Sequence, residues 1–212
     1  MERERIFSLI RENILACELM PGAELREAEL ARRYGVSKTP VRDAMQRLEY
    51  EGLIEIEPRR GHRVRPISMG DAEDLIEVRS ILESAAVAKT AKVASDAELQ
   101  TLDTFRRPDA GGVDAFAEYN RKFHIALAEL SRNRRLAEEI TRMMEFYDRL
   151  ALVSLASLSK SVGLEVPLAD HCAIIDSLQA RNGRLAARQM RQHVARSRSA
   201  IIKGLGRLPV VT

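Results

Sequence analysis

The sequence has no tryptophan, and aromatic residues make up only 4% of its 212 positions. It holds two cysteines, Cys17 and Cys172, whose wide separation matches no metal-binding or redox motif. These shortages exclude a disulfide-stapled scaffold, and we expect a protein of a reducing compartment, the cytoplasm. The core must be built from Leu, Ile, Val, Ala and Met, a mixture that favours packed helices.

Long apolar runs are also missing. No stretch approaches the roughly 20 residues that cross a bilayer, and the charged, amphipathic first 15 residues do not resemble a signal peptide. Apolar residues account for 45% and charged residues for 31% of the chain, as in a soluble globular protein. We therefore expect no contact with a membrane.

The chain has no large excess of positive or negative residues, since its formal net charge is only +3. Residues 58–66 nevertheless contain four arginines and no acid, and residues 177–212 contain eight Lys and Arg and no acid. Such runs are also typical of a solvated or internally paired face. For the second run, a preceding helix offers acidic partners at Glu138, Glu139, Glu145 and Asp148.

Within the first third of the chain, the spacing of hydrophobic residues changes from a helical to an alternating pattern. Helical periodicity predicts helices over 4–18, 27–34 and 37–51, with Pro21-Gly22 ending the first, Gly35 breaking the second and Ser37 capping the third. Alternation at 53–57 and 62–65, around a turn at 58–61, then predicts a short β-hairpin. Three helices followed by a hairpin indicate a winged helix-turn-helix at residues 1–66.

The rest of the chain shows only helical periodicity. They are expected at 70–93, 96–106, 113–131, 133–160, 166–181 and 183–204. Short connections favour antiparallel neighbours, hence a six-helix bundle. The predicted organisation of this mainly α protein is a DNA-binding domain at 1–66, a linker at 67–70, a ligand-binding and dimerisation bundle at 71–205 and a tail at 206–212.

Residues 30–49 have the pattern of a helix-turn-helix. An apolar stripe (Val41, Ala44, Met45 and Leu48) leaves the start of the second helix facing outward. Hydroxyls of Ser37 and Thr39 and free backbone N–H groups there suit phosphate, Arg42 suits a bidentate contact to guanine, and Lys38 suits guanine or phosphate. The wing adds cations at Arg59, Arg60 and Arg63 around Gly61. A small helical domain with surface arginines is the alternative.

The stretch from Pro21 to Val64, and above all GVSKTPVRDAMQRLEYEGLI, resembles the winged helix of the GntR family of bacterial regulators. The resemblance implies contacts to double-stranded DNA at Ser37, Lys38, Thr39, Arg42 and the wing. Some relatives carry an arginine at the position of Ala28, which Arg26 would replace, and Arg47 completes the predicted set. Lys38 stands where the family usually has arginine, which alone offers a bidentate fork.

Three histidines lie on the apolar faces of three helices in the second half. His124 shares a helical face with Asn120, four residues earlier, while His171 and His193 lie among aliphatic residues. A single such histidine is usually a satisfied core residue. Three of them on one bundle form a candidate site for Zn, Ni, Cu or Fe, completed by an oxygen donor.

Residues 71–204 resemble the FCD effector domain of the FadR subfamily, and six helices resemble its VanR-type branch. The anchors are EVRSILESAAVAKTA, NRKFHIALAELSRN and DHCAIIDSLQARNGRLAARQMRQHV. The resemblance implies a divalent metal, with zinc or nickel preferred, on His124, His171 and His193. Asn120 stands where the family has aspartate. It also implies a small carboxylate effector, which Arg79 would hold as a bidentate clamp, and the alternative for Arg79 is a helix-surface salt bridge.

The leading hypothesis is a homodimeric, ligand-responsive repressor that binds a palindromic operator and is not an enzyme. A helical sensor with a degenerate metal site, working without metal, is the first alternative. A metal hydrolase is the second, although no general base stands beside the histidines in the sequence, where Glu129 and Asp170 are merely nearby.

Overall fold

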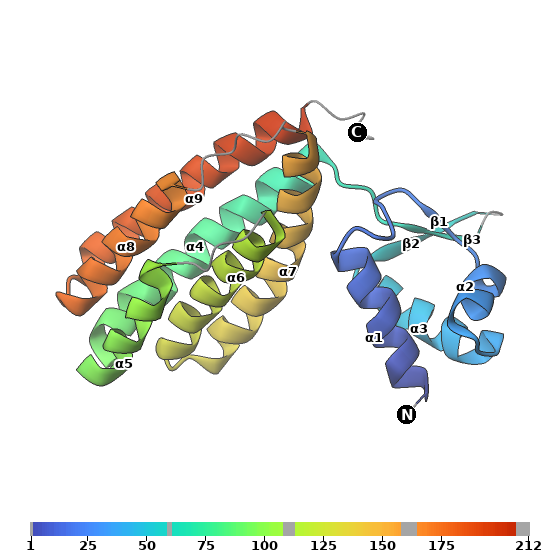
Figure 1. Ribbon diagram of the computed structural model, residues 1–212, viewed down its shortest axis with the longest axis horizontal. Coiled ribbons are helices and arrows are strands. Elements are labelled where there is room, and N and C mark those ends of the chain that lie inside the picture. Colours follow the sequence, from blue (N-terminus) through green and yellow to red (C-terminus); the bar gives the residue numbers. More distant parts are fainter. Residues whose placement is uncertain (1, 59–60, 108–112, 158–164, 207–212) are drawn as a thin grey trace. The chain divides into compact units, whose positions relative to one another are not determined.

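The computed structural model describes residues 2–58, 61–107, 113–157 and 165–206 (Figure 1). The chain divides between Ser68 and Met69 into two compact units. Helix α4 begins at Met69, so Met69 and Gly70 of the expected linker are helical, and Ile67 is buried.

The first unit is a small three-helix domain with a three-stranded antiparallel sheet in the order β1-β3-β2. Its elements are α1 (Glu2–Leu15), β1 (Glu24–Leu25), α2 (Glu27–Tyr34), α3 (Lys38–Tyr50), β2 (Ile54–Glu57) and β3 (Gly61–Val64). The predicted helices and hairpin are confirmed. Strand β1 was not predicted, because two residues are too few to show an alternating pattern.

The angle between α2 and α3 depends on a turn at Gly35. Gly35 adopts φ 65°, a left-handed conformation that glycine enters without steric cost. After the turn, α3 buries the predicted stripe of Val41, Ala44, Met45 and Leu48, each at most 1% exposed. Helix α1 packs its own apolar face against α3, so the outer face of α3 remains available.

One helix end lies earlier than expected, and one expected cap holds its position without a side-chain hydrogen bond. Helix α1 ends at Leu15 rather than at Pro21-Gly22, because the backbone turns at Cys17, where φ is 57°. Ser37 occupies the N-cap position of α3, but its side chain makes no capping hydrogen bond. The Ser37 hydroxyl is therefore exposed without a capping role.

In its described residues the second unit consists of helices and their connecting turns, without a strand. It contains α4 (Met69–Val93), α5 (Asp96–Thr101), α6 (Val113–Leu130), α7 (Arg134–Ser157), α8 (Glu165–Gln179) and α9 (Gly183–Leu205). The predicted helix at 96–106 instead splits into α5 and a 3-10 helix, η1 (Leu102–Arg106). Its start is as expected, since Ser95 and Glu98 form a reciprocal capping box.

Helix α4 packs against α6, α7 and α9, and α9 also packs against α7 and α8 (Figure 1). The bundle interior therefore collects side chains from α4, α6, α8 and α9, the helices that carry Arg79 and the three histidines. Among the described residues, no helix has an apolar stretch sufficient for crossing a bilayer.

Close contact between α7 and α9 depends on a glycine. A Cβ at Gly204 would lie 2.7 Å from both Cβ and the backbone oxygen of Ser154. Farther along the same pair, the hydroxyls of Tyr147 and Ser197 lie 3.0 Å apart. The absence of a side chain at Gly204 lets these helices bring polar groups together.

We expect Gly204→Ala to lower the free energy of unfolding by about 1–3 kcal/mol, because α7 and α9 must separate to admit the methyl group. Gly70→Ala is the matched control, since nothing lies within 4 Å of a Cβ there. Urea denaturation of both variants measures the difference. Equal stability of the two variants would contradict the close packing of these helices.

Candidate functional site

The start of helix α3 offers an exposed surface suited to an anion. Ser37, Lys38, Thr39 and Arg42 are exposed, and the first turn contains no acid. The unpaired N–H groups and dipole of a helix N-terminus favour negative groups. Within the described part of the chain, Lys38 has no ion-pair partner.

Arg42 is held in place by a neighbouring helix. Its Nε and Nη2 atoms donate to the two carboxylate oxygens of Glu27 on α2, each at 3.1 Å. The hydrogen bonds from Arg42 lower the pKa of Glu27. The guanidinium plane is thus oriented in advance, but a DNA base or phosphate must share or replace Glu27.

Arg26 and Arg63 are also paired with acids. Arg26 at the start of α2 donates to Glu24 at 3.1 Å, and Arg63 on β3 donates to Glu55 on β2 at 2.6 Å. Arg63 stands directly opposite Glu55 in the sheet. Gly61, at the tip of the predicted wing, adopts φ 103°. Arg59 and Arg60 lie outside the described residues.

Arg47 contacts α1 rather than facing the same way as Lys38. At 100° per residue, nine residues turn a helix by about 180°. Its guanidinium donates to Glu4 at 2.7 Å and lies over the Phe7 ring, 3.7 Å from the centroid. This geometry gives Arg47 a packing role between α1 and α3.

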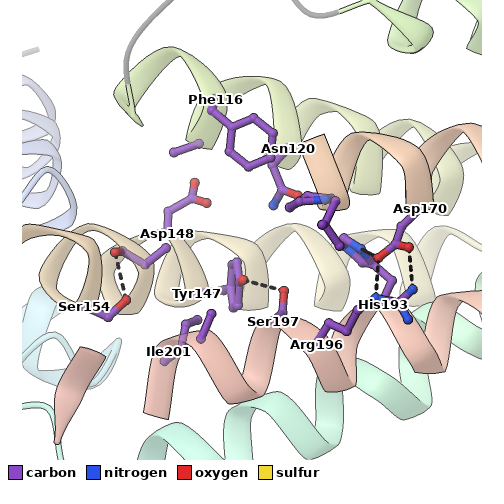
Figure 2. A pocket seen from close by; sticks show the side chains of 15 residues that line it. Phe116, Asn120, Tyr147, Asp148, Ser154, Asp170, His193, Arg196, Ser197 and Ile201 are labelled. Atoms are coloured by element: carbon purple, nitrogen blue, oxygen red, sulfur yellow. Dashed lines mark hydrogen bonds and ion pairs between the residues drawn. The ribbon is translucent and has the colours of Figure 1, made fainter. Parts of the chain in front are cut away.

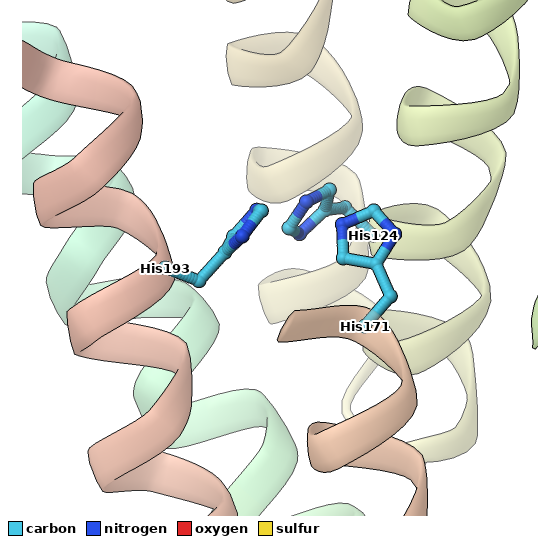
Figure 3. A group of neighbouring side chains, drawn as sticks. All are labelled: His124, His171 and His193. Carbon is cyan, nitrogen blue, oxygen red and sulfur yellow. The ribbon is translucent and has the colours of Figure 1, made fainter. Parts of the chain in front are cut away.

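In the second unit, the three predicted histidines meet in the bundle interior. Figure 3 shows the rings of His124, His171 and His193 pointing toward one another from α6, α8 and α9. One ring nitrogen from each lies within 4.8 Å of the others, and all three side chains are at most 3% exposed. Burial lowers the pKa of all three, that of His124 to about 4, so the imidazoles are neutral at pH 7.

Each histidine has an outward partner at Nδ1. His124 Nδ1 lies 2.9 Å from a carboxylate oxygen of Glu83, and His193 Nδ1 lies 3.2 Å from one of Asp170. Burial would raise the pKa of both acids, but attraction to Arg79 lowers the pKa of Glu83 to about 2, and hydrogen bonds from His193 and Arg196 lower that of Asp170. An ionised carboxylate only accepts hydrogen bonds, so Nδ1 of His193 carries the proton. Nε2 of His124 accepts from the Arg79 guanidinium, which leaves the proton of that neutral ring on Nδ1, facing Glu83.

His171 reaches the same state through a hydroxyl. The Tyr119 hydroxyl donates to the Phe105 carbonyl oxygen at 2.6 Å and lies 3.0 Å from His171 Nδ1. Since the only hydroxyl proton is used on Phe105, Nδ1 of His171 must be the donor. All three neutral rings therefore carry a lone pair on Nε2.

At two of the three rings, the Nε2 lone pair receives no hydrogen bond from the described residues. The Nε2 atoms of His171 and His193 are buried and have no hydrogen-bond partner among the described residues. An unsatisfied buried acceptor costs about 1–3 kcal/mol. Three neutral imidazoles whose other nitrogens are fixed by carboxylates or a hydroxyl are the usual ligand arrangement for zinc and related ions. The residues present therefore fit a divalent metal.

Asn120 lies one helical turn before His124 and is buried. Figure 2 shows its side chain directed from α6 into a pocket that His193 also lines. A carboxamide oxygen is a neutral donor, weaker toward a metal than a carboxylate oxygen. The histidines would thus carry most of the affinity.

Arg79 is fully buried beside the histidines, so the expected alternative of a surface salt bridge is wrong. It donates to Glu83 and to His124 Nε2, both at 2.8 Å, and its guanidinium lies 3.9 Å from the Tyr147 ring centroid. Arg79 is not among the residues described as lining the pocket. In this arrangement it fixes Glu83 and occupies the lone pair of His124.

The sequence did not predict the groups that face Nδ1 of the three histidines. Asp170 was judged near the histidines in sequence only, yet it contacts His193. Glu83 lies four residues after Arg79, a spacing that places the two on one helical face and was available as a signal. Tyr119 gave no comparable signal, because a tyrosine beside a phenylalanine cluster reads as ordinary core.

The cationic last helix is paired differently from expectation. Arg196 binds Asp170 with two nitrogens, and Arg198 binds Glu73. Of the acids expected as partners, Asp148 binds Arg121 on α6 and Glu138 pairs within its own helix. Part of the cationic run is thus internally paired, at Arg181, Arg196 and Arg198.

Known families match both halves of the chain. Residues 2–64 match the family described as bacterial regulatory proteins, gntR family, and residues 74–196 match the FCD domain. The HTH-type transcriptional repressor RspR of Escherichia coli is 29% identical over 196 residues, which cover 90% of this chain and 85% of RspR. An HTH-type transcriptional regulator of Streptomyces ambofaciens is 31% identical, over 91% of this chain and 81% of that protein.

The fold agrees with solved structures. The structure of E. coli McbR/YncC superposes with a TM-score of 0.79 at 19% identity, covering 95% of this chain and 97% of that one. At this identity the likeness concerns the fold alone. Taken with the family matches, it identifies the chain as a transcriptional regulator of the GntR family, with a winged helix-turn-helix followed by an FCD domain.

Proposed function

We propose that this regulator is a homodimeric repressor of the cytoplasm that binds a palindromic operator and releases it when a small organic acid enters the FCD domain. The observation that carries the proposal is the position of His193. Its Nε2 lone pair belongs to the histidine cluster, and its side chain lines a pocket beside that cluster. A ligand in the pocket therefore lies next to the candidate metal centre.

The candidate metal, zinc or nickel, would be held by His124, His171 and His193 with Asn120 as oxygen donor. When bound, it would offer a Lewis-acidic position to a carboxylate. Tyr119 and Asp170 keep His171 and His193 in the required tautomer, and a carboxylate oxygen of Glu83 lies 2.9 Å from Nδ1 of His124. For the metal to be bound at His124, Arg79 must give up its hydrogen bond to that ring.

A ligand changes DNA binding only if it binds one arrangement of the regulator more tightly than the other. The pocket lies among α6, α7, α8 and α9, four helices joined by side-chain hydrogen bonds such as Tyr147 to Ser197. A ligand that bridges these helices favours one helix arrangement. We propose that this arrangement sets the spacing of the two DNA-binding domains in the dimer.

The pairing of the nearby acids disfavours a metal hydrolase. Glu83 is bound to Arg79 and Asp170 to Arg196, and these contacts lower the pKa of both carboxyls. Both acids face Nδ1, on the side of the rings away from the converging Nε2 atoms. Neither is placed to act as a general base toward a metal-bound molecule.

We expect Arg42→Ala and Lys38→Ala to weaken binding to the regulator's own promoter by about 1–3 kcal/mol each, since both face outward at the recognition helix. Arg47→Ala is the control for arginine loss on the same helix and should leave the affinity near that of the wild type. Fluorescence anisotropy at two salt concentrations measures the effect. Failure of the wild type to prefer its promoter over random DNA would refute the proposal.

Glu27→Gln keeps the size of the side chain but releases the charge that holds Arg42. We expect affinity for random DNA to rise by about threefold or more, because an acid near the phosphates is removed. The preference for the promoter should fall, since Arg42 is no longer oriented. Glu29→Gln removes a neighbouring exposed charge and is the control. An unchanged promoter preference in Glu27→Gln would show that Glu27 does not orient Arg42.

The metal is tested on untagged protein by elemental analysis and by titration with zinc and nickel. His171→Ala should abolish stoichiometric binding. Tyr119→Phe should weaken it by about 10–100-fold, because the outer hydrogen bond is lost. Tyr147→Phe, whose hydroxyl contacts Ser197 instead, should bind like the wild type. Asn120→Asp should bind more tightly than the wild type.

Stoichiometric metal in His171→Ala would contradict the histidine ligands. Failure of the wild type to bind either metal, together with a ligand response, would favour the metal-independent sensor.

A further inference from the structure

The pocket beside the histidines is small and mostly apolar. It has a volume of about 210 Å³, with walls that include Phe116, Ala151, Val166 and Ile201 (Figure 2). A cavity of about 150 Å³ holds benzene, so this one takes a ligand of about eight non-hydrogen atoms. A ligand of that size with an apolar middle can have one polar group at each end.

One end of the pocket has an acid with a free oxygen. Asp148 on α7 is 7% exposed, and its Oδ2 accepts a hydrogen bond from Arg121 at 3.1 Å. Its Oδ1 is buried and has no hydrogen-bond partner in the part of the chain that the structure describes. Burial raises the pKa of Asp148 to about 6 despite Arg121, so the carboxylate is mainly ionised at neutral pH and can only accept.

The other end holds the cationic groups. Arg196 lines the pocket, and Asp170 holds its guanidinium through Nε and Nη2. His193 lies beside them, with Nε2 directed to the histidine cluster. In the view of Figure 2, Asp148 and His193 lie on opposite sides of Tyr147. The pocket therefore has an acceptor at one end, and the Arg196–Asp170 ion pair and the candidate metal centre at the other.

Building on the proposed sensing of an organic acid, we infer that the effector carries two polar groups: a carboxylate at the His193–Arg196 end and a hydroxyl or ammonium that donates to Asp148 Oδ1. A plain carboxylate of the same length would place a methyl group against Asp148. The buried Oδ1 would then remain unsatisfied and would lose any remaining access to water. A dicarboxylate would place like charges together there.

Three acids matched in size test this inference: hexanoate, 5-hydroxypentanoate and 5-aminopentanoate. Isothermal titration of the full chain, with its metal content fixed and measured, gives the affinities. We expect the hydroxy or amino acid to bind at least about tenfold more tightly than hexanoate. Equal or tighter binding of hexanoate overturns the inference. So does the absence of binding by all three acids at about 10 mM.

Two variants assign the preference to Asp148. In Asp148→Asn the affinities for hexanoate and for the hydroxy or amino acid should differ by no more than about threefold, because an amide oxygen is a weaker acceptor than a carboxylate. Arg121→Gln is the comparison variant, since it breaks the same ion pair but leaves Oδ1 in place. Because it also removes a cation that lowers the pKa of Asp148, it should retain the preference at a pH well above that pKa. A preference that persists in folded Asp148→Asn refutes the role of Asp148. If that variant does not fold, the wild-type comparison of the three acids decides.

The test of the two-group effector can fail or succeed independently of the test of the proposed function. Operator binding is measured in parallel with each acid present. A donor-dependent preference without any change in operator affinity would reject the sensing proposal and keep the chemistry of the pocket. Release of the operator by hexanoate alone would support the sensing proposal and reject the inferred role of Asp148.

Discussion

The FCD domain is organised around a single electrostatic constraint: three neutral imidazoles whose lone pairs point at one another inside the bundle. Arg79 on α4 imposes this state on His124 by donating to Nε2, while Tyr119 on α6 and Asp170 on α8 impose it on His171 and His193 at Nδ1. Bringing three acceptors together without enough donors costs free energy, which a cation or a donor would recover. The arrangement therefore stores binding energy for a ligand at a point where four helices meet.

Acidic side chains play a comparable role in the DNA-binding domain. Residues 1–66 carry thirteen Lys and Arg against twelve acids, and the cations at positions 26, 42 and 63 each pair with a glutamate. Exposed pairs of this kind contribute little to stability. Each pair holds a guanidinium in a fixed direction and offsets its charge, which leaves Lys38 as the unpaired charge at the start of α3 among the described residues.

Much of this could be predicted from the sequence, because helical periodicity identifies the face that each helix buries. The stripe from Val41 to Leu48 and the inward direction of His124, His171 and His193 followed from spacing alone. Periodicity does not say which helix packs on which. The burial of Arg79 against Tyr147 and the free oxygen of Asp148 depend on those pairings, so neither was predictable. Strand β1 was missed for a different reason, since two residues show no period.

The tautomers of the three histidines are the most direct test of this account. Long-range proton–nitrogen correlation spectra of the metal-free protein at pH 7 distinguish a protonated Nδ1 from a protonated Nε2 in each ring. We expect His124, His171 and His193 all to be neutral with the proton on Nδ1. A proton on Nε2 of any of them, or an imidazolium among them, would contradict the inward convergence of lone pairs on which the candidate metal centre depends.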